Sequence, residues 1–171
     1  MRAMGPGSVS SLLKTALDVV YYLSLILAAG SLVAAAVVLI LSVDLGYVPV
    51  AGGREIRPSP SQAAELLALF SLYVAVVVVV LGRVRAVFAT LTLGDPFHPA
   101  NVNRLRWIGV GLAALEALLF IGRMLLNTQI PGAVRGWPID VTAWFSVLVV
   151  FVLAEVFREG ARLRREAELT I

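Results

Sequence analysis

One acidic residue lies inside an apolar stretch, where it could carry chemistry. Glu116 follows Trp107 by nine residues, roughly 14 Å along a helix at 1.5 Å per residue, which is near the middle of a bilayer. A charged side chain at that depth costs about 2.5–3.5 kcal/mol on insertion scales, so it requires a partner or a function. Gly109, Ala113 and Ala117 form a row of small residues that lets another helix approach. Glu116 shares a side with this row, so we expect it to face the bundle interior.

The same depth arithmetic suggests partners for this carboxyl group. Tyr73 in the second apolar stretch, and Tyr21 or Tyr22 in the first, lie at a similar depth. A phenol could donate a hydrogen bond to Glu116, which lipid cannot do. Two interpretations stay open for this intramembrane polar site. One is a hydrogen-bonded glutamate that sets helix registry, and the other is a site that senses protons or cations.

A second group of charged residues is predicted nearer the inner face of the membrane. It consists of Asp18, Glu155, Arg83 and Arg106, with Lys14 and Arg85 at the same level. Ion pairs among them would tie the four helices together at that end. The alternative is a polar inner vestibule that binds a partner or a ligand headgroup.

Other chemistry has little support in the sequence. The chain has no cysteine and one histidine, His98, which excludes thiolate metal sites and multi-histidine metal sites. It contains no glycine-rich phosphate loop and no HExxH, CxxC or GxSxG motif. We therefore expect no catalytic residues, no metal and no cofactor, and we predict that the protein is not an enzyme.

The elements that position these residues follow from hydropathy. Of the 171 residues, 60% are hydrophobic, and four apolar stretches are long enough to approach the roughly 20 residues that a membrane helix needs. The sequence predicts one all-α domain over residues 1–171, an integral membrane bundle of four transmembrane helices. The spans are expected at about 14–41, 61–84, 104–126 and 140–158.

Loop charge predicts the orientation. Basic residues concentrate before the first span, between the second and third, and after the fourth. By the positive-inside rule both termini, the loop 85–103 and the tail 159–171 are cytoplasmic. The first apolar run is too long for a cleaved signal peptide, so we expect it to be retained.

Local signals mark several helix starts and one turn region. Ser59 and Gln62 fit a capping box with Pro60 at the first helical position. Asp140 can cap the fourth helix. The outer loop 42–61 is rich in glycine and proline around Val48 and could form a short hairpin.

The cytoplasmic segments carry the residues that could bind a partner. Arginines and glutamates alternate along the tail at spacings that allow pairing on a helix surface. This mixture argues against direct nucleic-acid binding, which requires a basic face. The predicted docking residues are Arg104, Arg106, Arg158, Glu159 and Arg162.

Two polar motifs carry a resemblance to a known family. The first joins Asp95-Pro96-Phe97 to the segment Asn101-Val-Asn-Arg104-Leu-Arg106-Trp-Ile-Gly109. The second is Ala154-Glu155-Val-Phe157-Arg158-Glu159-Gly160-Ala-Arg162-Leu163, with Glu166, Glu168, Leu169 and Thr170 after it. Over about Leu12 to Ile171 the chain resembles a bacterial family of small four-helix membrane proteins catalogued as a domain of unknown function. Its members are often encoded beside a Cro-like helix-turn-helix regulator, so the resemblance implies such a transcriptional regulator as a partner and no catalytic residues.

Two functions from different classes remain. The leading hypothesis is a non-enzymatic regulatory or sensory membrane protein that docks a cytoplasmic partner. The alternative is a small transporter or channel component, possible as a homo-oligomer, with the intramembrane Glu116 on the pathway.

Overall fold

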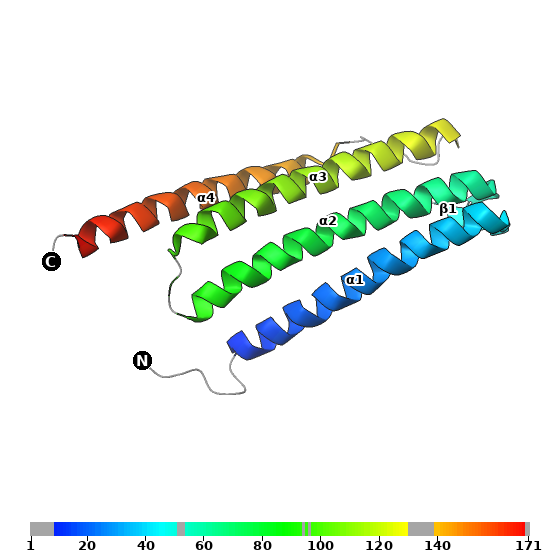
Figure 1. Ribbon diagram of the computed structural model, residues 1–171. Coiled ribbons are helices and arrows are strands. Elements are labelled where there is room, and N and C mark those ends of the chain that lie inside the picture. The colour runs from blue at the N-terminus through cyan, green and yellow to red at the C-terminus, as the bar shows by residue number, and fades with distance from the viewer. Residues whose placement is uncertain (1–8, 51–53, 94, 96, 130–138, 170–171) are drawn as a thin grey trace.

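The described residues form four long helices and one short hairpin (Figure 1). The computed structural model describes residues 9–50, 54–93, 95, 97–129 and 139–169, so parts of the expected outer loop, middle loop and tail lie outside it. In chain order the elements are α1 (Val9–Leu41), β1 (Val48–Val50), β2 (Arg54–Ile56), α2 (Pro60–Thr92), α3 (Pro99–Gln129) and α4 (Val141–Glu168). The predicted all-α membrane fold is confirmed, because all four helices are long and apolar enough to cross a bilayer.

The helices run past the expected spans mainly at one end of the molecule. We call this the terminal end: α1 begins there, α2 turns into α3, and α4 ends (Figure 1). The opposite end, which carries β1 and β2, is the hairpin end. α2 continues to Thr92 and α4 to Glu168, whereas the apolar runs end about eight to ten residues earlier. Polar residues at a helix end remain helical outside lipid, so hydropathy marks the membrane core rather than the helix ends.

Each helix packs against its neighbours in chain order. Among the described residues, α1 contacts α2, α2 contacts α3 and α3 contacts α4, with no backbone approach between other helix pairs. Most apolar side chains therefore face outward, including Ile40 and Val141, each 77% exposed. Acyl chains cover such surfaces in a bilayer, so this exposure is expected of a membrane protein.

Small residues bring α1 and α2 together. Ser71 on α2 donates a hydrogen bond to the backbone oxygen of Ala28 on α1 at 2.8 Å. Toward the hairpin end, Val38 of α1 packs against Ala63 and Ala64 of α2. Short side chains allow close helix approach, and hydroxyl groups add hydrogen bonds across the interface.

Glycines on α3 serve the interfaces on both of its sides. Gly111 is buried against Val80 of α2, with no room for a Cβ. Gly109 faces α4, where a Cβ would lie 3.0 Å from the ring of Phe151. α3 is therefore the helix that α2 and α4 approach most closely through glycine.

The predicted local signals are confirmed. Ser59 and Gln62 form the capping box at the start of α2, with Pro60 in the first turn. The Asp140 side chain accepts hydrogen bonds from the backbone N–H groups at the start of α4. The outer loop forms an antiparallel hairpin in which Val48 pairs with Ile56.

Candidate functional site

Polar contacts join the helices at the terminal end, beginning between α1 and α2. The Oδ1 atom of Asp18 lies 2.5 Å from Nη2 of Arg85. The Arg85 guanidinium also lies over the ring of Tyr21, with Cζ 4.4 Å from the ring centroid, and 5.5 Å from that of Tyr22. This one arginine therefore joins a carboxylate and two aromatic rings of the neighbouring helix.

A buried asparagine joins α2 to α3. Asn101 is 0% exposed, and its Nδ2 donates to Oγ1 of Thr90 at 2.7 Å. Its Oδ1 accepts a hydrogen bond from Nη1 of Arg104 at 2.9 Å. The same nitrogen of Arg104 donates to the backbone oxygen of Ala86 at 2.9 Å. The amide of Asn101 is thus hydrogen-bonded through both its oxygen and its nitrogen, as a buried polar group requires.

The α2–α3 turn is held against the end of α4. Asp95 in the turn forms an ion pair with Arg164 of α4. The ring of Phe97 packs on that of Phe157 with centroids 5.5 Å apart. A Cβ on Gly160 would lie 2.6 Å from Phe97, so the missing side chain leaves the space that this ring occupies. The turn and the end of α4 therefore form one continuous surface.

The structure does not bring the four residues of the predicted inner-leaflet charge cluster together. Asp18 belongs to the α1–α2 junction described above. Glu155 forms an ion pair with Arg158 of its own helix. Arg83 and Arg106 are exposed, and in the described part of the chain no ion pair reaches either side chain. The terminal end is joined by polar contacts, but largely through residues other than this set.

The predicted docking residues of α4 are exposed and interact along the helix. Arg162 pairs with Glu159 at 2.6 Å and with Glu166 at 3.7 Å. A surface hollow of about 540 Å³ is lined by Arg158, Glu159, Arg162, Arg165, Glu166 and Leu169. Exposed ion pairs of this kind contribute little to stability, so a variant that breaks them should still fold.

Glu116 lines a groove between α3 and α4. The groove has a volume of about 550 Å³, and its lining residues are Glu116, Ala117, Phe120, Ile121, Ile139 and Trp144. Glu116 is half-buried. It shares a side of α3 with Gly109, which faces α4. In the described residues, no hydrogen bond or ion pair reaches its carboxyl group.

The structure does not bring the predicted tyrosine partners to this groove. Tyr21 and Tyr22 lie on α1 beside Arg85, and α1 makes no backbone approach to α3 in the described residues. Tyr73 is half-buried on α2 and is not among the residues that line the groove. These tyrosines were candidates because of their predicted depth in the membrane. Which side chains contact each other depends instead on which helices are neighbours.

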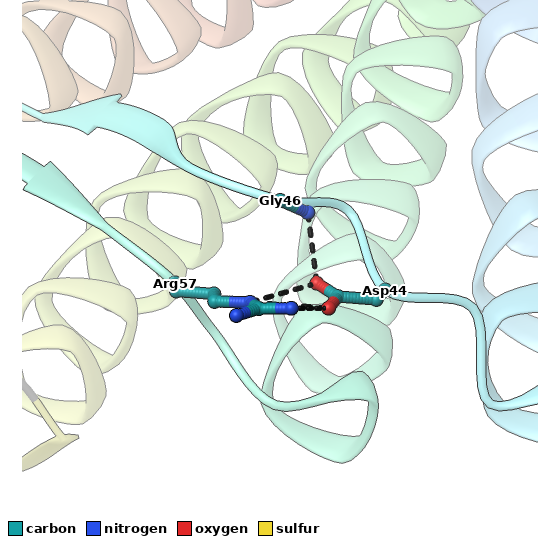
Figure 2. Close-up of polar contacts among 3 residues, drawn as sticks. All are labelled: Asp44, Gly46 and Arg57. Atoms are coloured by element: carbon teal, nitrogen blue, oxygen red, sulfur yellow. Dashed lines mark hydrogen bonds and ion pairs between the residues drawn. The ribbon is translucent and has the colours of Figure 1, made fainter.

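A polar contact that the sequence did not single out orders the outer loop (Figure 2). Nε of Arg57 donates to Oδ2 of Asp44 at 3.1 Å, and Oδ1 of Asp44 accepts from the backbone N–H of Gly46 at 2.9 Å. Gly46 has a φ of +68°, a conformation that favours glycine. The hydrogen bonds from Arg57 and then Gly46 lower the pKa of Asp44 below its usual value of about 3.9.

The Asp44–Arg57 contact is expected to respond to acid. Because the pKa of Asp44 is lower in the folded loop than in an unfolded chain, the contact stabilises the loop above about pH 3.9 and is lost as the pH falls through the lowered value. An NMR titration of the Gly46 amide should show its midpoint below 3.9. The Asp44→Asn variant should lack this transition, and a wild-type midpoint at or above 3.9 would contradict the assignment.

Two surface features stand out among the described residues. Within them, no group of three or more histidine, cysteine, aspartate or glutamate side chains is placed to hold a metal ion. What the structure offers instead is a mixed-charge surface at the terminal end and a groove with one carboxylate at mid-helix.

A family model covers most of these features. Residues 44–171 match the model described as a protein of unknown function, DUF2975. The chain belongs to this family. The match contains the outer hairpin, α2 to α4 and both polar motifs of the sequence, and the predicted resemblance to a four-helix membrane family of unknown function is confirmed. No curated protein and no solved structure matches the chain.

Sequence reasoning missed several residues that the DUF2975 fold uses. Asn101 stood in the first motif, yet only its spacing of three from Arg104 hinted that both side chains share one helix face. Asp95 stood in the same motif, but its partner Arg164 is distant in sequence. No local signal identifies such a long-range pair.

Proposed function

We propose that this protein is a non-enzymatic regulatory or sensory membrane protein that docks a cytoplasmic protein at its terminal end. The partner has a surface with acidic and apolar groups, and the helix-turn-helix regulator implied by the sequence resemblance is the candidate. The protein lies in a bacterial plasma membrane with both termini in the cytoplasm. The positive-inside distribution supports this orientation, because the arginines concentrate at the terminal end.

One observation carries this proposal: the turn and the tail form one surface. The Asp95–Arg164 ion pair and the packing of Phe97 on Phe157 hold two segments together that are far apart in sequence. A docking face made from both requires such a contact. A partner would therefore meet a surface that is largely pre-formed, which lowers the entropy lost on binding.

The groups on this face suit a protein better than a lipid surface alone. Three arginines and two glutamates line the hollow on α4, and Leu169 beside them is 84% exposed. Leu163 on the same helix is 54% exposed. Mixed charge with apolar residues provides specificity for a protein surface, whereas a lipid anchor is predominantly basic.

Reversing two charges on this face tests the proposal. In the Arg158→Glu/Arg162→Glu variant, recovery of the cytoplasmic partner with the protein from native membranes should fall at least tenfold, since like charges now oppose its acidic surface. The measurement is affinity purification in mild detergent with quantitative mass spectrometry. The amount of protein in the membrane should not change, because exposed ion pairs contribute little to folding.

The matched control reverses an arginine at the other end. Arg57→Glu changes the same kind of exposed, paired arginine in the outer loop and should leave partner recovery unchanged. Arg104 is not used, because it belongs to the buried Asn101 junction and its loss would disturb folding. Equal partner recovery from the α4 variant and wild type would exclude docking on this face.

A further inference from the structure

The groove at Glu116 lies where α4 begins. Gly109 of α3 faces Phe151 of α4, and one heptad further along α3, Glu116 shares the groove with Trp144, one heptad earlier on α4. Trp144 stands in the first turn of α4, which starts at Val141. Figure 1 shows the same stagger, with α4 starting beside the middle of α3. Glu116 therefore faces the beginning of one membrane helix from the middle of another.

Glu116 lies near the middle of a helix that is long and apolar enough to cross a membrane. It lies about three residues past the midpoint of the candidate membrane span Pro99–Thr128. The carboxyl group is half-buried in a groove of about 550 Å³, within the usual size range of small-molecule sites. Ionisable groups inside a membrane commonly mark functional sites.

The lining of the groove indicates the chemistry of an occupant. Apart from Glu116, the described residues that line it are apolar: the aromatic rings of Phe120 and Trp144, the aliphatic side chains of Ile121 and Ile139, and Ala117. A carboxylate in such surroundings favours a positive charge. Aromatic faces attract cations too, tryptophan most strongly. An occupant that matches all these groups carries one positive charge on an apolar body.

We propose that this groove is a binding site for amphiphilic organic cations that enter from the lipid. Glu116 pairs with the charge, while Phe120 and Trp144 pack on the apolar body. The described lining residues provide one carboxylate and no other strong metal ligand, so they suit an organic cation better than a metal ion. The site is the groove between α3 and α4, which shares no lining residue with the hollow of the docking face. Cation binding here therefore does not depend on the proposed docking function.

Two ions of the same shape and opposite charge test this site. The probes are tetraphenylphosphonium and tetraphenylborate, each added to the full-length protein in phosphatidylcholine nanodiscs. Free tetraphenylphosphonium, followed with an ion-selective electrode, should show saturable binding above that of empty nanodiscs. Tetraphenylborate should show only the partitioning seen with lipid alone, because Glu116 repels it.

Variants separate a charge effect from a folding effect. Glu116→Gln keeps the shape of the side chain and should weaken tetraphenylphosphonium binding at least tenfold. Trp144→Ala should weaken it as well, through the lost ring. Glu65→Gln, the same change at an exposed residue near the start of α2, should leave the affinity unchanged. Circular dichroism checks that each variant keeps its helix content.

Three results would overturn the proposal. The first is tetraphenylphosphonium binding no greater than that of empty nanodiscs. The second is equal binding by wild type and Glu116→Gln. The third is a dimer in nanodiscs that Trp144→Ala dissociates and that excludes tetraphenylphosphonium, which would assign the groove to a second copy of this chain.

Discussion

Replacing Gly111 with alanine is expected to destabilise the protein by about 1–3 kcal/mol, as overpacking of a tight interface typically does. A Cβ at this position would overlap Cγ2 of Val80 on α2. Val80 is β-branched and has few side-chain rotamers, so it cannot swing aside without strain. Unfolding in mixed micelles of increasing SDS content, followed by circular dichroism, measures the change.

A second substitution should reverse the effect. Val80→Ala removes the overlapping methyl group, so Gly111→Ala should be tolerated far better in that background than alone. Gly30→Ala is the matched control, because no atom lies within 4 Å of a Cβ built there and alanine favours helix. Unfolding of Gly111→Ala at the same SDS content as wild type would contradict the close contact between α2 and α3 at this position.

The helices could be predicted from the sequence because lipid imposes a simple rule. A chain in hydrocarbon must pair its backbone groups internally, so an apolar run of sufficient length forms a helix. The caps at Ser59 and Asp140 were predictable for a similar reason, since each satisfies backbone N–H groups within three residues of itself. Interactions this local can be read from one segment alone.

The partners of the inner charges could not be predicted in the same way. Arg83 and Arg85 were predicted at nearly the same depth. However, side chains two positions apart on a helix point about 200° away from each other. Only Arg85 faces α1 and pairs with Asp18. Position along an apolar run indicates the depth of each charged group. The rotation of each helix about its axis depends on packing against a neighbour, so it could not be predicted.

The candidate site at Glu116 was predictable in part. Its spacing of seven residues from Gly109 predicts a shared helix face, because seven residues make nearly two turns. The approach of Trp144 was not predictable, since it depends on the stagger between α3 and α4. The connection between two helices does not determine that stagger by its length alone.

Replacing Asn101 with alanine is expected to destabilise the protein by about 2–3 kcal/mol, near the upper end for leaving buried polar groups unsatisfied. The change removes the acceptor for Nη1 of Arg104 and the donor to Oγ1 of Thr90. Both groups lie at the α2–α3 junction, where water has little access. The same unfolding assay in mixed micelles measures the loss.

The neighbouring asparagine separates the effect of lost hydrogen bonds from the gain in helix propensity that alanine brings. Asn103 is exposed on the same turn of α3, so Asn103→Ala should change stability by no more than about 0.5 kcal/mol. Asn101→Asp keeps an acceptor for Arg104 but loses the donor to Thr90, and should fall between wild type and alanine. Equal effects of alanine at the two positions would show that the buried amide does not hold α2 against α3. A large effect at Asn101 alone would identify this amide as the contact that fixes the α2–α3 turn, and with it the surface to which α4 is joined.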